Sequence, residues 1–338
     1  MTVSLFCYSD SGAKLAIKLC EMLNIEKNRV HSIEKFASVY GFTSHVKISE
    51  AVGKLFYEND ALIFIGACGI AVRETAPYLR SKTTDPAVLV TDDRGKYVIP
   101  ILSGHIGGAN EYARQIAALL GAEAVITTST DGAGKFSCDA WAAKNGYVIS
   151  SMKAAKDVSA EILKRDVCVC SDYELPDVLP NGLVRGDKGA TGIYIGTGDK
   201  SPFDNTLRLI PRTLTLGIGC RRGTVKEAIA EAVSTVFHNH CLDLRAIGKI
   251  ASIDVKRDET GLLAFAEEIK AETLFYTAEE LNSVQGEFEE SEFVKKTVGT
   301  GNVCERAAAA GGGTVIVKKT ALNGVTVAVA EEKRRIEF

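Results

Sequence analysis

Short apolar runs alternate with segments of helical periodicity from the first residues of the chain. The runs are typical of buried strands, and the segments between them place apolar residues at every third or fourth position. This alternation predicts helices packed on a mainly parallel sheet. The expected strands of the first 130 residues are Val3 to Tyr8, Val30 to Ile33, Ala61 to Ile65, Ala87 to Thr91, Tyr97 to Leu102 and Ala124 to Thr127.

Helices are expected between these strands, for example over Ala13 to Leu23 and Ala109 to Leu120. In the second helix Ala113 and Ile116 repeat at helical spacing, and Gly121 follows where a helix often ends in a glycine. Residues 1–130 are therefore predicted to form a doubly wound α/β domain.

The pattern loosens over residues 131–212, where an amphipathic stretch from Lys153 to Lys164 precedes a passage rich in Pro, Gly and Asp. We interpret this part as a small middle domain or an elaborate linker. Layering resumes with an expected strand at Leu214 to Ile218, and the chain closes with two Val-rich stretches separated by Asn323-Gly324, a strong turn signal. A C-terminal α/β domain over residues 213–338 completes a multi-domain α/β protein.

Charge and cysteine content limit the classes of partner. The chain has 40 Lys and Arg against 43 Asp and Glu, a formal charge of -3, so no overall attraction to nucleic acid or an anionic membrane is expected. No apolar run is long enough for a membrane span, and the N-terminus lacks the features of a signal peptide. Nine scattered cysteines without a C-x-x-C pair favour a reducing cytoplasm over a disulfide framework.

The densest polar segment, Leu102-Ser-Gly-His-Ile-Gly-Gly-Ala-Asn-Glu111, lies where a strand is expected to end and a helix to begin. A helix N-terminus offers unpaired N–H groups, and glycines let an anion approach the backbone, so the segment predicts a carboxylate or phosphate cradle. His105 lies inside it and can move protons near neutral pH. The alternative is a tight turn at Gly107 and Gly108, with His105 bonded to nearby backbone.

Other polar residues follow neighbouring strands, and ligands of open sheets gather at the carboxyl ends of strands. Arg73 could clamp a carboxylate with its planar guanidinium, or pair with Glu74. Thr128 and Asp131 line the same crevice or cap the next segment. Asp85, which precedes a proline, fits a turn at least as well as a catalytic role.

A second glycine-rich turn, Leu216-Gly-Ile-Gly-Cys-Arg-Arg-Gly-Thr224, carries Arg221 and Arg222 and predicts another anion site. Its glycines are spaced one residue too widely for the dinucleotide fingerprint, and no G-x-x-x-x-G-K-[ST] loop occurs. A nicotinamide, flavin or nucleoside triphosphate is therefore not expected.

By residue type alone, a metal could be bound by His238, His240 and Cys241. These residues end an amphipathic helix, where cations suit the helix dipole, so a metal is not expected there.

Taken together, these stretches resemble the CbiG family, the cobalt-precorrin-5A hydrolases of anaerobic cobalamin biosynthesis. The resemblance covers nearly the whole chain and is weakest over residues 131–212. Asn323 and Thr300 depart mildly from the family pattern. The matching stretches are Gly69 to Arg73, Lys82 to Val88, Leu102 to Glu111, Ile126 to Asp131, Leu216 to Thr224, Ala251 to Lys256, Thr297 to Val303 and Gly324 to Ala330.

The resemblance implies hydrolysis of the ring A acetate δ-lactone of cobalt-precorrin-5A, release of acetaldehyde and formation of cobalt-precorrin-5B. Cobalt arrives within this small-molecule corrinoid, so the protein needs no cofactor or metal site of its own. A homodimer and transient contacts with other enzymes of the pathway stay open. The alternative is a non-catalytic carrier of corrinoid intermediates, because the C-terminal domain resembles stand-alone proteins of the aerobic pathway.

Within this reaction we expect His105 to act as the base, with Glu111, Asp131 and Lys256 in reserve. The N–H groups of Gly107 and Gly108 are the expected oxyanion or carboxylate donors. The full expected substrate-binding set is Arg73, Ser103, Gly104, Gly107, Gly108, Asn110, Thr128, Gly219, Arg221, Arg222 and Lys256.

Overall fold

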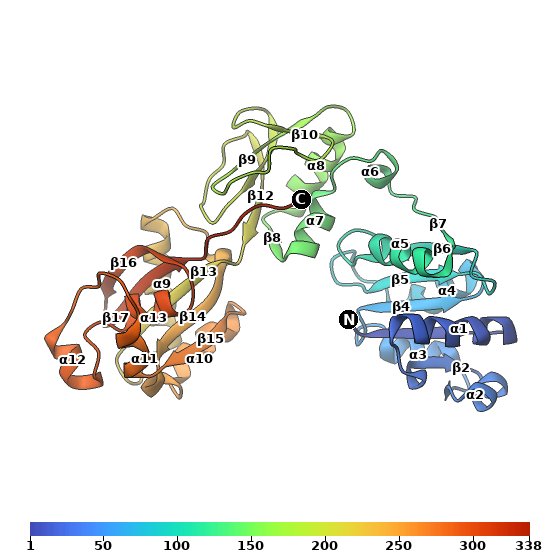
Figure 1. Cartoon of the computed structure of the whole chain (residues 1–338), viewed down its shortest axis with the longest axis horizontal. Coiled ribbons are helices and arrows are strands. Elements are labelled where there is room, and N and C mark those ends of the chain that lie inside the picture. Colours follow the sequence, from blue (N-terminus) through green and yellow to red (C-terminus); the bar gives the residue numbers. More distant parts are fainter. The chain divides into compact units, whose positions relative to one another are not determined.

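Strands that are buried on both faces form the centre of the N-terminal part. Every residue is buried in β1 (Val3–Cys7), β4 (Ala61–Ile65) and β5 (Ala87–Thr91), so this sheet needs a layer on each side. The computed structural model describes the backbone of the whole chain and all side chains except those of residues 130, 131, 293 and 294. It divides into two compact units, residues 1–145 and 146–338 (Figure 1).

Alternate residues of these strands enter two separate cores, as the period of a strand requires. Leu5 and Ile63 pack with helices α1 (Asp10–Leu23) and α5 (Ala109–Leu120) on one face. Phe6 and Phe64 pack with α3 (Ile48–Leu55) and α4 (Cys68–Thr75) on the other. The expected doubly wound layering is confirmed.

The sheet of the first unit has the order β3-β2-β1-β4-β5-β6-β7. It is parallel from β3 to β5, but β6 pairs antiparallel with β5, and β7 runs parallel to β6. The residues after β6 therefore lie at the edge where β5 begins. The remaining elements of this unit are η1 (Lys27–Arg29), β2 (Val30–Ser32), α2 (Glu34–Tyr40), β3 (Thr43–Ser44), η2 (Ala76–Tyr78), β6 (Tyr97–Leu102), β7 (Glu123–Ala124), α6 (Ser129–Gly132) and α7 (Cys138–Asn145).

The second unit begins with a five-stranded sheet of order β10-β9-β11-β12-β8, in the part of the chain interpreted as a small middle domain or an elaborate linker. The expected division at residues 130/131 and 212/213 stays a prediction, although α7 groups with the first unit rather than with this sheet. The elements are β8 (Tyr147–Ile149), α8 (Met152–Ile162), β9 (Val167–Ser171), β10 (Leu183–Arg185), β11 (Thr191–Ile195) and β12 (Asn205–Pro211).

The last sheet has the order β15-β14-β13-β17-β16, with β13 to β15 parallel and the final hairpin antiparallel. Asn323 and Gly324 both have positive φ, 47° and 85°, which confirms the expected turn. The elements are β13 (Leu214–Cys220), α9 (Lys226–Asn239), η3 (Leu244–Ala246), β14 (Ile247–Ile253), η4 (Asp254–Lys256), α10 (Thr260–Glu268), β15 (Glu272–Tyr276), α11 (Ala278–Ser283), α12 (Glu292–Val298), α13 (Cys304–Ala310), β16 (Thr314–Leu322) and β17 (Val325–Glu331).

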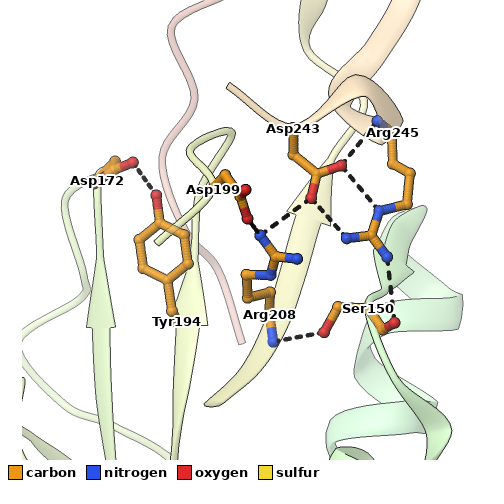
Figure 2. A network of polar contacts seen from close by, with 7 residues as sticks. All are labelled: Ser150, Asp172, Tyr194, Asp199, Arg208, Asp243 and Arg245. Atoms are coloured by element: carbon orange, nitrogen blue, oxygen red, sulfur yellow. Dashed lines mark hydrogen bonds and ion pairs between the residues drawn. The ribbon is translucent and has the colours of Figure 1, made fainter. Parts of the chain in front are cut away.

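A buried ion-pair network joins the two sheets of the second unit (Figure 2). Asp243, before η3, is 7% exposed and accepts hydrogen bonds from the Arg245 side chain at 2.7 and 2.9 Å. Arg208 of β12 lies 3.4 Å from the same carboxylate, and Arg245 also donates to the Ser150 carbonyl oxygen at 3.2 Å. Burial raises the pKa of Asp243, but the hydrogen bonds from Arg245 and the charges of both arginines outweigh it and leave the pKa lowered.

Replacing Asp243 with Ala should lower the free energy of unfolding by about 2 to 4 kcal/mol, because two arginines lose their buried counter-charge. Denaturant unfolding at pH 7 measures the loss. The lowered pKa means that the ionised carboxylate stabilises the fold above its unfolded pKa and stops doing so as pH falls through the folded pKa. The difference in free energy of unfolding between wild type and variant should therefore disappear below about pH 4.

The matched control is Asp258→Ala, which removes an ion-pair partner of Arg222 that is 66% exposed. Its effect should be much smaller, because exposed ion pairs are screened by solvent. Equal losses in the two variants would contradict the structural role assigned to the buried network.

Candidate functional site

The loop after β6 is tightly held by its own residues. Ser103 has a positive φ of 55°, and its hydroxyl donates to the Asp85 carbonyl oxygen at 2.8 Å. A Cβ on Gly107 would lie 2.4 Å from the Ser103 Cβ, so only glycine fits there. The loop therefore holds its conformation without a ligand.

One of the two expected donors of the anion cradle at the start of α5, the Gly108 N–H, is already used within the loop. The N–H of Gly108 donates to the His105 carbonyl oxygen at 3.0 Å. The N–H groups of Ala109 and Asn110 donate to the carbonyl oxygens of Ser103 and Gly104 at 3.2 and 3.0 Å. Three N–H groups that a ligand could have used are thus satisfied by the loop itself.

Asn110 and Thr128 support this loop from inside. Asn110 is 4% exposed, and its amide donates to the Thr128 hydroxyl oxygen at 2.9 Å. A Cβ on Gly104 would lie 2.7 Å from the Asn110 side-chain oxygen. Asn110, Gly104 and Thr128, all expected to bind substrate, lie together, and these contacts are with one another.

The imidazole of His105 lies beside the carboxylate of Asp139, in the first turn of α7. His105 Nδ1 is 3.3 Å from Asp139 Oδ1, and the two side chains are 20% and 11% exposed. Burial raises the pKa of Asp139, but hydrogen bonds from His105, Ser137 and the Ala140 N–H outweigh it and lower the pKa to about 2. Asp139 is ionised at neutral pH, so the imidazole faces a fixed negative charge.

Sequence reasoning missed Asp139. Its local sequence shows only that it is acidic, near the start of a helix and two residues after Ser137, and this pattern is typical of helix capping. Its packing could not be anticipated either: the neighbouring Cys138, Trp141 and Ala142 are buried, which fixes the side of α7 on which the carboxylate lies.

Two of the expected site residues of the first unit do not join this cluster. Arg73 is exposed on α4, which begins at the opposite sheet edge, and its guanidinium donates to the Gly69 carbonyl oxygen at 3.3 Å. Glu111 is half exposed and lies 3.5 Å from Arg114 of its own helix. The side chain of Asp131 lies outside the described residues.

Asp85 has the turn role that its position before a proline suggested. Its carboxylate accepts hydrogen bonds from the N–H groups of Arg80 and Ser81.

A pocket of about 280 Å³ opens in the second unit, at the carboxyl ends of β13 and β14. The expected residues Gly219, Arg221 and Lys256 line it, together with Lys319. The cations of the described lining are Arg221, Lys256 and Lys319, and this lining contains no carboxylate, which favours an anionic ligand. Apolar walls come from residues such as Val298.

Side chains of the protein also occupy part of the glycine-rich turn beside this pocket. The N–H of Gly223 donates to the carboxylate of Glu259 at 2.6 Å, and Lys256 lies 3.1 Å from the same carboxylate. Arg222 is exposed and pairs with Asp258. Arg221 is exposed, and neither it nor Lys319 forms an ion pair among the described side chains.

The described side chains contain no group of three or more His, Cys, Asp or Glu arranged as metal ligands. Within the same part of the chain, no helix is both long and apolar enough to cross a membrane.

Two family models match the chain: "Cobalamin synthesis G N-terminal" over residues 50–131 and "Cobalamin synthesis G C-terminus" over residues 214–330. The cobalt-precorrin-5A hydrolase of Salmonella typhimurium is 33% identical over 91% of this chain and 91% of its own. The chain belongs to the CbiG family. A cobalt-precorrin-5A hydrolase of Priestia megaterium is 32% identical over 82% of this chain and 79% of its own.

A solved structure of a cobalamin biosynthesis protein G homologue from Sulfolobus solfataricus covers 98% of this chain and 97% of its own, at 24% identity and a TM-score of 0.42. The two CbiG models leave residues 132–213 unmatched, so Asp139 lies outside both.

The glycines of the CbiG turn at β13 have a packing role that can be tested. A Cβ on Gly217 would lie 1.7 Å from the Cys304 carbonyl oxygen of α13. Gly217→Ala should therefore push α13 off β13 and lower the free energy of unfolding by about 3 kcal/mol or more. Denaturant unfolding followed by circular dichroism measures the change.

Gly69→Ala is the control, because the nearest atom to its added Cβ is the flexible end of Arg73, at 3.5 Å. Alanine is preferred over glycine in helices, so this variant should keep or raise the melting temperature. A harmless Gly217→Ala would mean that α13 does not pack on β13 as described.

Proposed function

We propose that this chain is a cobalt-precorrin-5A hydrolase that opens the ring A acetate δ-lactone and releases acetaldehyde. The observation that carries the proposal is the 33% identity to a relative of that name over 91% of both chains. A protonatable side chain in a half-buried loop, His105, gives the chemistry a candidate base.

The proposed reaction has two steps. Water adds to the lactone carbonyl carbon while a base removes one of its protons, and the ester C–O bond then breaks to give a carboxylic acid and an alkoxide. The carboxylic acid loses its proton to solvent. The alkoxide collapses to a carbonyl group, the carbon–carbon bond to the ring breaks, and acetaldehyde leaves. The bonding electron pair passes to the conjugated macrocycle, as in a reverse aldol reaction.

His105 is the proposed base of the first step. Its imidazole is 20% exposed, so the ring is partly shielded from water but open to a reactant. Glu111, which is held by Arg114, is a poorer candidate, and Lys256 is committed to Glu259. Because the Gly108 N–H is engaged, we retain Gly107 as the backbone donor to the developing oxyanion.

Arg221 and Lys319 are the proposed partners of the substrate's peripheral carboxylates, because Lys256 of the same pocket is paired with Glu259. The pocket that they line, about 280 Å³, is too small for a whole corrinoid ring but suits an acidic side chain of one. We propose that cobalt enters within the substrate, that no other cofactor takes part and that the protein acts in the cytoplasm, where its nine free cysteines stay reduced.

His105→Ala should lower the rate of acetaldehyde release by about 10²-fold or more, because a general base contributes that much. The assay is anaerobic incubation with cobalt-precorrin-5A, with acetaldehyde and the visible spectrum followed together. His238→Ala, a substitution on the exposed end of α9, is the control and should keep full activity.

An unchanged rate in His105→Ala would reject the base assignment. Wild-type protein that changes the spectrum of the corrinoid but releases no acetaldehyde would instead support a carrier.

Arg221→Ala should raise KM about tenfold and leave kcat within about threefold, because a peripheral carboxylate is bound equally in the ground and transition states. Lys333→Ala, which removes an exposed cation away from the pocket lining, should change neither constant. A fall in kcat alone for Arg221→Ala would move this residue from binding to the chemical step.

A further inference from the structure

The carboxylate of Asp139 is fixed before any substrate arrives. Its Oδ1 accepts the Ser137 hydroxyl at 2.8 Å and the Ala140 N–H at 3.0 Å. It lies in the first turn of α7, where the helix dipole favours a negative charge. The side chain is 11% exposed, so water competes little for these bonds.

We propose that Asp139 is a positioning residue for His105, and that it holds the proton on Nδ1 so that Nε2 is the basic nitrogen. A neutral imidazole carries one N–H, and a carboxylate 3.3 Å from Nδ1 stabilises the tautomer with the proton there. The lone pair is then on the opposite side of the ring. This role rests on the proposed function, in which His105 takes a proton from water.

The two halves of this pair come from separate, rigid elements. His105 belongs to the loop between β6 and α5, where its carbonyl oxygen accepts the Gly108 N–H at 3.0 Å. Asp139 belongs to α7, whose Cys138 and Trp141 are buried. Neither side chain can easily turn away, so the pair fixes the ring orientation as well as the tautomer.

Two other carboxylates among the described side chains near the loop are bound elsewhere. The Asp85 carboxylate is bound by the N–H groups of Arg80 and Ser81, and Glu111 lies beside Arg114. Asp139 contacts the imidazole directly, so its removal should change how His105 binds protons.

Asp139→Ala removes the acceptor, whereas Asp139→Asn keeps an oxygen acceptor for Ser137 and Ala140 but removes the charge. We expect kcat for acetaldehyde release to fall about 10²-fold in Asp139→Ala, with KM within about threefold. Asp139→Asn should lie between this variant and wild type, and the acidic limb of its kcat/KM profile should move to lower pH, because the imidazolium loses its counter-charge. Glu58→Gln, an exposed carboxylate of the same unit, should leave rate and profile unchanged.

A second readout needs no substrate. In ¹⁵N-histidine spectra, the His105 signal, identified by its loss in His105→Ala, should show a protonated Nδ1 and an unprotonated Nε2 at pH 8. Asp139→Ala should abolish this preference. If Asp139→Ala does not fold, Asp139→Asn carries the test through its kcat/KM profile, because it retains the local hydrogen bonds and removes the charge.

The outcomes separate this inference from the function on which it rests. If His105→Ala is inactive while Asp139→Ala keeps its rate within threefold, the positioning role is overturned and the base assignment stands. If wild-type protein releases no acetaldehyde, the proposed function fails. The ¹⁵N spectra still test the positioning role of Asp139, because a proton on Nε2 of His105 in wild type would overturn that role.

Discussion

The geometry of the first unit depends on the reversed direction of β6. Because β6 pairs antiparallel with β5, Leu102 lies opposite Val88, and the His105 loop emerges where β5 begins rather than where it ends. The same reversal separates the loop from the exit of β4 and the helix that carries Arg73. The turn between β5 and β6 dictates it: Gly95 has a φ of 66°, and the Asp92 carboxylate accepts three N–H groups of the turn. A connection this short cannot make the crossover that a parallel pair needs.

That turn was visible in the sequence, and its consequence could have been predicted. Residues 92–96 separate two apolar runs and contain Asp and Gly, which is the pattern of a hairpin. The five strands expected between Val3 and Leu102, and the two helices named at Ala13 to Leu23 and Ala109 to Leu120, agree with the structure because apolar patterns determine them. The middle sheet was not predicted, because β8 and β10 are three residues each, and such strands form only through partners distant in sequence.

Glycine-rich turns explain why the candidate site was only partly predictable. A sequence shows how many backbone donors a turn contains, but not which groups of the protein satisfy them. At α5 the loop carbonyl oxygens accept three N–H groups, and at β13 the carboxylate of Glu259 accepts that of Gly223. Gly217 is explained by the close approach of α13. The side chains His105 and Arg221 therefore carry more of the proposed chemistry than the backbone around them.

Both candidate sites place a buried carboxylate behind the group that would meet the substrate. Asp139 lies behind His105, and Glu259, which is 4% exposed, lies behind Lys256. Lys256 and Glu259 are three residues apart in one local segment, whereas His105 and Asp139 come from two elements and have no sequence signature. The effect of the carboxylate also depends on the group beside it. A carboxylate beside an imidazole selects a tautomer and leaves a basic nitrogen, but one beside an ammonium group neutralises much of its charge. Recognition of an anion at the second pocket must therefore depend mainly on Arg221 and Lys319, which have no such partner among the described side chains.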